Sequence, residues 1–401
     1  MEFSNRYIKR IISHGTRIKY ETVMNKLRKY LLKRGKDDLL FAELNSDVVA
    51  DIRKYMHDSG MSNNTINSYL KIINSFISAA IKEDVYVFFR HPFASVTYKK
   101  EEVVPDSLTQ EDIEKIISTP ISSDHFLYKY KLTFLFQFFA QGMRISDVQQ
   151  LRFNMLKTEY IVYNMRKTAS PMLVHMNKNL IEILKVVVRK YHINDGDPLF
   201  AQLFGFEEQL VATLYKFKKR IEEIYRVDNG YHLYLDGLVP LDENDTQTLK
   251  LKTEIEHLRF NTNNFYVNAF ARFFSVDENY KRRFIFQFLA DSDFKNIGED
   301  NDFSKMTEKQ YKTIRNNNIV IDRGLKKIQK LAGLSTDLKS HLARHSYTSQ
   351  LLNTEGADIY MISKSLGHSD VKTTQSYISR FHNKKIDQGN RAISDKYEVK
   401  L

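Results

Sequence analysis

Ionisable side chains gather in the stretch HLARHSYTSQLL, near the end of the chain. His341, Arg344 and His345 fall on roughly one face of the helix expected here, because residues three or four apart are neighbours on a helix surface. Two histidines four apart could also bind a metal ion. The stretch lacks the glutamate of the HExxH motif, and a third ligand would have to come from a distant segment, so a metal site is not expected.

Arg144 is expected in a tight turn between two helices. The apolar stretch LTFLFQFFA runs toward Gly142, a natural left-handed helix end, and Ser146 with Gln149 fits a capping box for the next helix. A guanidinium held beside a helix N-terminus can bind a phosphate through paired hydrogen bonds. Taken alone, the stretch is better explained by a surface arginine paired with Asp147.

Two further stretches carry single residues of interest. YIVYNMRKTASPMLVHM alternates as two short strands, with Lys167 at or beside the turn, from which its ammonium could donate a proton into a neighbouring groove. LGHSDVKTTQSYI places His368 just after a helix-ending glycine and Tyr377 on a short helix. Most hairpin lysines are merely solvated and most tyrosines on short helices belong to the core, so neither residue is informative alone.

Together these residues meet the needs of phosphoryl transfer without a metal. They supply counter-charge for the non-bridging oxygens, a proton donor for the leaving oxygen, and a nucleophile. A tyrosine hydroxyl has an ordinary pKa of about 10, so clustered positive charge would be needed to favour its phenolate near neutral pH. The candidate catalytic set is Arg144, Lys167, His341, Arg344, His368 and Tyr377.

Composition narrows the class of protein. The chain has 401 residues, enough for two ordinary domains, and a formal net charge of +12, which favours a polyanionic partner. It has no cysteine, which excludes disulfides, thiolate metal sites and a cysteine nucleophile. The start of the chain lacks the apolar region of a signal peptide, and no apolar run is long enough to span a bilayer, so we expect a cytoplasmic protein without membrane contact.

Apolar residues recur at helical spacing over most of the chain, and strand-like alternation is convincing only within residues 160–176. We therefore expect a mainly α protein with a small antiparallel β-sheet. In the first segment, helices are expected to end at Gly35 and Gly60, and Ser46 is expected to be the N-cap of the second helix.

Changes in composition suggest the domain boundaries. Residues 1–96 are expected to form a helical domain with a basic, polar face, and residues 97–106 a linker. Residues 107–380 would form the second domain and residues 381–401 a tail. Residues 201–312 have mixed charges and weak periodicity, and we prefer a tolerated surface insertion there over a segment that contacts DNA arms or partner proteins. The acidic stretches DENDTQ and GEDNDF lack the pattern of a calcium-binding loop, so we expect solvated loops at these two stretches.

The motifs resemble those of the tyrosine recombinases of the phage-integrase family. GMRISDVQQLRF, RKTASPMLV, HLARHSYTSQLL and LGHSDVKTTQSYI occur in the order typical of that family, and SNNTINSYLKIINSFISAAI resembles its helical, SAM-like core-binding domain. The likeness covers residues from about 16 to 200 and from about 313 to 380. The likeness implies a core DNA-binding domain followed by a catalytic domain. The chain departs from the usual family pattern in having a long insertion at residues 201–312, and no separate arm-binding domain is expected before residue 16.

The resemblance also implies how the phosphate would be held. Arg144 and Arg344 would grip the scissile phosphate of DNA, and Asp147 would support the first arginine. His341 would assist proton transfer and orient the phosphate, and His368 would donate a hydrogen bond to it.

The remaining implied roles belong to the reacting groups. Lys167 would be the general acid toward the departing 5′ hydroxyl. Tyr377 would attack the phosphorus and leave a 3′-phosphotyrosyl bond whose energy is kept for religation. Neither a cofactor nor a metal would be required.

The family's usual mode of action implies the partners. Two double-stranded DNA sites would exchange strands one at a time within a homo-tetramer. The C-terminal tail would either dock on a neighbouring subunit or fray. Accessory DNA-bending or directionality proteins are possible partners. Two other functions stay open: a type IB topoisomerase, which relaxes supercoils by the same tyrosine chemistry, and a non-catalytic DNA-binding regulator on the same scaffold.

Overall fold

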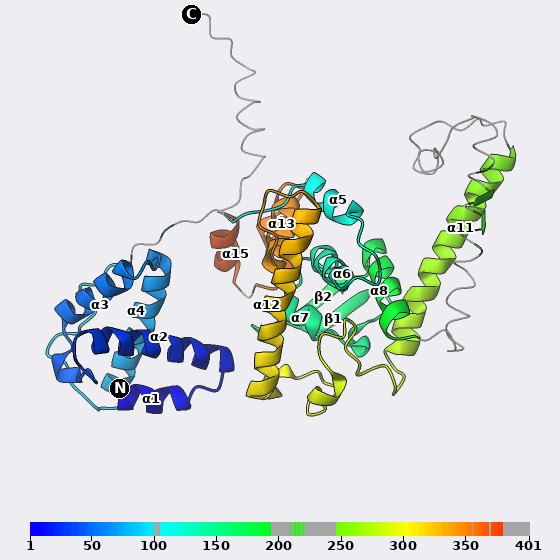
Figure 1. Cartoon of the computed structure of the whole chain (residues 1–401). Coiled ribbons are helices and arrows are strands. Elements are labelled where there is room, and N and C mark those ends of the chain that lie inside the picture. The colour runs from blue at the N-terminus through cyan, green and yellow to red at the C-terminus, as the bar shows by residue number, and fades with distance from the viewer. Residues whose placement is uncertain are drawn as a thin grey trace, which may run out of the picture. The chain divides into compact units, whose positions relative to one another are not determined.

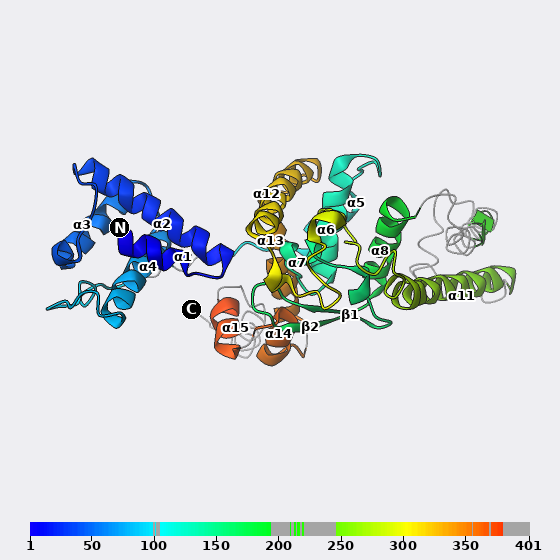
Figure 2. The same ribbon diagram turned by 90° about the horizontal axis from the view of Figure 1, so that it is seen from below.

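The structure, a computed structural model, forms two compact units, Met1–Val104 and Pro105–Leu401. It describes residues 1–98, 101, 105–193, 209, 212–213, 215–216, 219, 246–354, 356–368 and 370–379, and it leaves out the side chains of residues 247–248, 259–268, 272–273 and 376–377. Figures 1 and 2 show the elements of each unit from two directions.

The first unit is a bundle of helices. They are α1 (Glu2–Lys9), α2 (His14–Lys33), α3 (Ser46–Asp58) and α4 (Asn63–Lys82). Gly35 and Gly60 follow the ends of α2 and α3 with φ angles of +66° and +74°, as their sequence positions predict. The inward faces predicted for α2 and α4 are buried in one core, which includes Val23, Leu27, Leu31, Ile66, Leu70, Ile73 and Ile77.

The N-cap of α3 is Asn45, and the prediction of Ser46 was wrong by one residue. The Asn45 side chain accepts hydrogen bonds from the N–H groups of Asp47 and Val48, both at 3.0 Å. Ser46 is therefore the first residue of the helix. Asparagine and serine are about equally good caps, so their adjacency left the sequence ambiguous.

The second unit is mainly helical with a two-stranded antiparallel sheet, which confirms the predicted fold class. Its elements are α5 (Gln110–Ser118), α6 (Phe126–Phe139), α7 (Ile145–Gln149), β1 (Tyr160–Asn164), β2 (Pro171–His175), α8 (Lys178–Tyr191), α11 (Thr246–Ala269), α12 (Glu308–Leu331), α13 (Ser340–Leu352), α14 (Ile359–Leu366) and α15 (Val371–Ile378).

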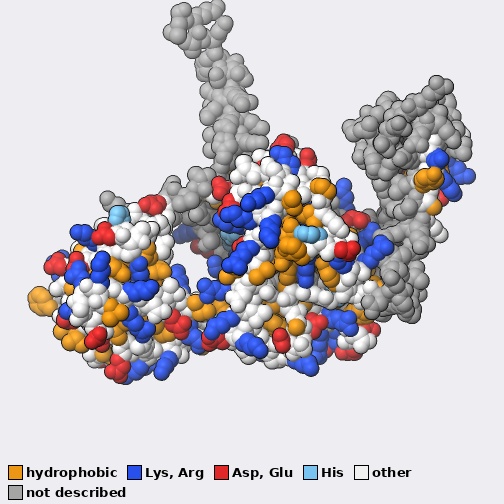
Figure 3. All heavy atoms as spheres, viewed as in Figure 1, with side chains coloured by type: hydrophobic (Ala, Val, Ile, Leu, Met, Phe, Trp, Pro, Cys, Tyr) orange, Lys and Arg blue, Asp and Glu red, His pale blue; other side chains and the backbone are white. Residues whose placement is uncertain are grey.

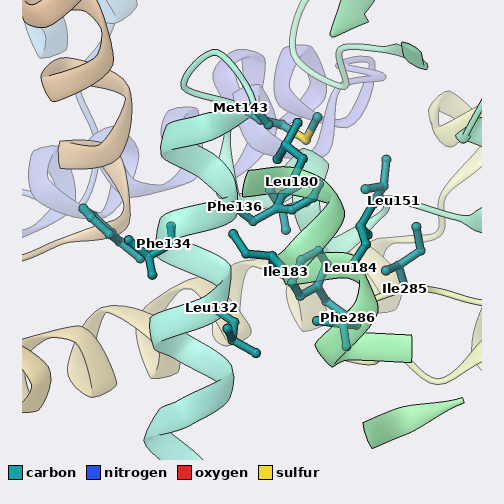
Figure 4. Packing of buried hydrophobic residues seen from close by; sticks show 14 of the residues in the cluster. Leu132, Phe134, Phe136, Met143, Leu151, Leu180, Ile183, Leu184, Ile285 and Phe286 are labelled. Carbon is teal, nitrogen blue, oxygen red and sulfur yellow. The ribbon is translucent and has the colours of Figure 1, made fainter. Parts of the chain in front are cut away.

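Helix α6 lies at the centre of this unit. Its sequence is apolar nearly all round, and neighbouring helices α7, α8, α12 and α13 pack against it. Figure 4 shows side chains of α6 and α8, among them Phe136 and Leu184, packed together with Ile285 and Phe286. The arrangement fixes the starts of α7 and α13 relative to one another, and both candidate arginines lie at these helices.

The two strands form the hairpin that the alternation predicted. Tyr160 pairs with His175 and Asn164 pairs with Pro171. On both strands the second and fourth residues are buried and the others are exposed, which is the pattern of a sheet with one face on the core. The hairpin turn therefore projects from a fixed base.

The weak periodicity of the region up to residue 312 did not reveal a long helix and a buried segment. GEDNDF lies mostly in turns and irregular backbone, as expected, and most of DENDTQ lies outside the described residues. Residues 246–269 form the long helix α11, and the segment that follows it buries Phe270, Phe274, Phe284 and Phe294 in the core of the unit. Arg152, only 2% exposed, holds part of this segment by donating to the carbonyl oxygens of residues 294, 297 and 298. The remaining part, residues 201–245, lies largely outside the described residues.

Candidate active site

Arg344 on α13 is 4% exposed and connects two distant turns of the chain. Its Nη1 donates to the carbonyl oxygen of Gly142 at 3.2 Å, and its Nη2 donates to the carbonyl oxygen of Leu366 at 2.6 Å. A buried guanidinium needs such acceptors, because an unpaired buried charge is costly. These bonds fix the direction of the side chain from the core toward the region of Arg144 and His368.

Gly142 and Arg144 form the turn that precedes α7. Gly142 has a φ of +66°, as predicted, and a Cβ atom added there would lie 2.9 Å from Cα of Arg344. Arg144 is the N-cap of α7, with extended backbone angles, and its Nη1 contacts Sδ of Met165. Ser146 lies inside the helix, so the predicted capping box with Gln149 does not form.

Asp147 connects α7 to the hairpin, and the support for Arg144 that the resemblance implies stays a prediction. The Oδ1 atom of Asp147 accepts a hydrogen bond from the backbone N–H of Arg166 at 3.1 Å. Burial raises the pKa of the carboxyl, and the charges of Arg144, Arg166 and Arg344 act against that rise. Asp147 therefore attaches the β1–β2 hairpin to α7.

Lys167 lies in the turn of that hairpin and is exposed. Its charge is close enough to lower the pKa values of both His341 and His368. The structure thus brings the hairpin turn into the electrostatic neighbourhood of the two histidines.

His341 is the second residue of α13 and lies next to His345. The two rings meet edge to face with centroids 4.4 Å apart. Desolvation and then the charges of Arg344, Arg144 and Lys167 lower the pKa of His341. The ring is therefore neutral near pH 7. Among the described residues, no three histidine, aspartate or glutamate side chains converge as a metal site requires.

His368 follows Gly367, which ends α14 in the left-handed conformation at a φ of +62°. The His368 Nδ1 atom is 2.9 Å from Oγ1 of Thr374, a fully buried residue of α15. Desolvation first, and then the neighbouring cations, lower the pKa of His368 to about 4. The hydrogen bond fixes the orientation of a neutral ring.

Tyr377 lies within α15, which packs on α14 and α13. Its side chain is outside the described residues. The structure therefore describes the position of α15 and not that of the Tyr377 hydroxyl.

Sequence reasoning missed two residues of this region, Met165 and Thr374. Met165 was not singled out, although it stands two positions before Lys167. Thr374 stands three positions before Tyr377, where helical spacing allows it to share a face with that residue. Neither methionine nor threonine by itself indicates a functional site, so these two residues could be identified only from their contacts in the structure.

Two family models match the chain. The model described as the phage integrase SAM-like domain matches residues 1–97, and the one described as the phage integrase family matches residues 290–384. The second match includes His341, Arg344, His368 and Tyr377.

Curated relatives match over shorter stretches. The tyrosine recombinase XerD of Shewanella oneidensis is 48% identical over 46 residues, which are 12% of this chain and 15% of that protein. The tyrosine recombinase XerC of Rickettsia bellii is 45% identical over 58 residues, which are 14% of this chain and 19% of that protein. The chain thus spans less than a fifth of the length of these relatives.

Solved structures resemble the whole chain. A structure of the Tn1549 transposon integrase with a circular intermediate DNA matches with a TM-score of 0.53 and 14% identity, over 99% of this chain and 98% of that one. At that identity the likeness shows the fold alone. None of the helices in the described part of this chain is long and apolar enough to cross a membrane. The chain is thus similar to phage integrases over residues 1–97 and 290–384, and the curated proteins that it matches are tyrosine recombinases.

Proposed function

We propose that the protein is a site-specific DNA recombinase, acting in the cytoplasm, that cuts and rejoins DNA strands through Tyr377. One observation carries this proposal. The cationic groups Arg344, Arg144 and Lys167, from three separate segments, all lower the pKa values of His341 and His368. Like charges repel, so such a cluster is costly unless an anion completes it. A DNA phosphate supplies that anion.

The proposed reaction begins with the phosphate held between Arg144 and Arg344. The Tyr377 oxygen attacks the phosphorus and gives up its proton to His341, which is able to accept it because its ring is neutral. The bond from phosphorus to the 5′ oxygen breaks, and Lys167 protonates the departing oxygen. His368 donates a hydrogen bond to a non-bridging oxygen.

The product is a 3′-phosphotyrosyl bond, and reversal of the same steps by a new 5′ hydroxyl rejoins the strand. No hydrolysis occurs, so the bond energy is retained. The steps require positioning and counter-charge, which usually make the largest contributions to phosphoryl transfer.

The outer surface of α12 supports a polyanionic partner. It exposes Lys309, Lys312, Arg315, Arg323, Lys326, Lys327 and Lys330. Figure 3 shows Lys and Arg side chains spread over the viewed surface of each unit. Such surfaces supply salt-dependent affinity for the DNA backbone. We propose double-stranded DNA as the substrate, the first unit as its core-binding domain, and a homo-tetramer on paired sites as the active assembly.

The test uses nicked suicide duplexes taken from the DNA that flanks the gene. Wild-type protein should become covalently attached, which a denaturing gel detects, and Tyr377→Phe should bind without attachment. Tyr360→Phe is the matched control, because Tyr360 is exposed on the neighbouring helix α14. Attachment of the Tyr377→Phe protein at the wild-type level would refute the assignment of Tyr377 as the nucleophile.

A second experiment uses two paired sites, which should give recombinant DNA products. Relaxation of supercoils without strand exchange would instead point to a topoisomerase.

A further inference from the structure

Met165 lies where three parts of the candidate active site meet. Its side chain is 1% exposed at the end of β1, and its Sδ contacts Nη1 of Arg144 at 2.6 Å. Its methyl group lies so close to Gly367 that a Cβ atom added to that glycine would overlap with it. Gly367 immediately precedes His368, so one side chain touches both the arginine turn and the histidine turn.

The backbone of Met165 closes the turn that carries Lys167. Its N–H donates to the carbonyl oxygen of Ser170 at 2.9 Å, and its carbonyl oxygen accepts from the N–H groups of Thr168 and Ala169. Met165 is therefore linked by main-chain hydrogen bonds to the turn that carries Lys167, and by its sulfur to Arg144.

The chemical nature of the contact matters. A thioether is a weak hydrogen-bond acceptor, whereas a carboxylate binds a guanidinium strongly and often through two bonds. A carboxylate at this position would compete with a phosphate for Arg144. The sulfur of Met165 orients the guanidinium and leaves its full charge for an incoming phosphate.

We propose that Met165 is a positioning residue, which aligns Arg144 with the Lys167 turn and His368 before DNA binds. The inference rests on the proposed recombinase function and deepens it. Met165 does not touch the reacting atoms. Its contribution is to keep three cationic or polar groups directed at one phosphate.

Met165→Leu tests the sulfur, because leucine keeps a similar apolar volume and removes the acceptor. Met172→Leu is the matched control, since Met172 also places its sulfur against Gly367. The described sulfur partner of Arg144, however, is Met165. Thermal unfolding of both variants should show that each is folded.

The first measurement is single-turnover cleavage of the suicide duplex at saturating DNA. Met165→Leu should lower the cleavage rate by roughly ten- to a hundredfold, as expected for a slight misplacement of a reacting group, while its dissociation constant for DNA stays at the wild-type value. Met172→Leu should cleave at the wild-type rate. In an Arg144→Lys background the effect of Met165→Leu should largely disappear, because the two residues act as a unit. A wild-type rate for Met165→Leu, or the same loss in both backgrounds, would overturn the inference.

The second measurement does not require cleavage. In protein labelled with carbon-13 at the methionine methyl groups, Arg144→Lys should shift the Met165 resonance, with Met56 of the first unit as an unshifted reference. An unmoved Met165 resonance would refute the contact. If wild-type protein never attaches to DNA, the recombinase proposal fails, and the methyl spectrum still decides whether Met165 holds Arg144.

Discussion

Arg344 donates a hydrogen bond to the carbonyl oxygen of Gly142 at 3.2 Å, across 202 positions of the sequence. The contact is close as well as polar, because an added Cβ on Gly142 would lie 2.9 Å from Cα and 3.0 Å from Cγ of Arg344. It holds the start of α7 against α13. The relative placement of the two candidate phosphate-binding arginines therefore depends on a glycine.

Gly142→Ala should destabilise the fold for two reasons. Alanine in the left-handed region costs about 1–2 kcal/mol, and overlap with Arg344 adds a further cost of about 1–3 kcal/mol typical of overpacking. Gly333→Ala separates the backbone cost from the overlap cost. Gly333 has a φ of +64°, and no atom lies within 4 Å of a Cβ added there, so only the backbone cost applies. Urea unfolding should show the larger loss for Gly142→Ala. Equal losses would mean that the contact with Arg344 is unimportant.

Arg344→Ala should slow cleavage on the order of 3 kcal/mol in transition-state free energy, the cost typical of removing one preorganised donor. Arg344→Lys keeps the charge but cannot present several planar N–H donors at once, so it should recover only part of the rate. Single-turnover cleavage at saturating DNA measures both, with thermal unfolding as the control for the loss of the bonds to Gly142 and Leu366. An unchanged cleavage rate in Arg344→Ala would show that Arg344 does not stabilise the transition state.

The sequence predicted local structure well at positions where the residue type strongly favours one backbone conformation or one pairing pattern. Gly142 and Gly367 both adopt positive φ at the ends of helices, and the β-hairpin pairs as its alternation indicated. In each case a short-range rule of backbone geometry decides the outcome, and distant parts of the chain do not alter it.

Predictions failed where distant contacts decide. The hydrogen bond from the backbone N–H of Arg166 to Asp147 was not predicted, because it forms only when the hairpin folds back onto α7. Phe270 and Phe284 lie in a segment with poor periodicity, yet they fill the core because Arg152 and its neighbours hold that segment in place. Irregular backbone has no repeating pattern, so the sequence alone could not identify these residues as buried. The roles of the six candidate residues stay predictions.

Thr374→Val should impair the chemistry more than the fold. The Thr374 hydroxyl is within 2.9 Å of Nδ1 of His368, and by donating to that atom it would keep the proton on Nε2, which can then donate to the phosphate. Valine keeps the shape and removes the hydroxyl, so we expect the cleavage rate to fall by roughly tenfold, as for other partners that fix a histidine tautomer. Thr373→Val, at an exposed neighbouring position, is the control and should cleave normally. Equal rates in the two variants would contradict the role of the hydroxyl.

His192 should make stability depend on pH. The ring is 7% exposed, and its Nε2 donates to the carbonyl oxygen of Ile285 at 2.7 Å. Burial, more than the nearby cations, lowers its pKa from 6.5 to about 4. Between these values the unfolded chain binds a proton that the folded protein does not, so the free energy of unfolding falls as the pH falls. The full effect is about 3 kcal/mol, present above pH 6.5 and lost by pH 4.

The measurement is urea unfolding at a series of pH values across that interval. His192→Gln can still donate to Ile285 but cannot titrate, so its free energy of unfolding should fall less steeply than that of the wild type as the solution is acidified. His368, whose pKa is also lowered to about 4, adds a loss in the same direction, and it remains in the variant. The slope should therefore be reduced and not abolished. The same slope in wild type and variant would show that His192 is protonated in the folded protein as readily as in the unfolded chain.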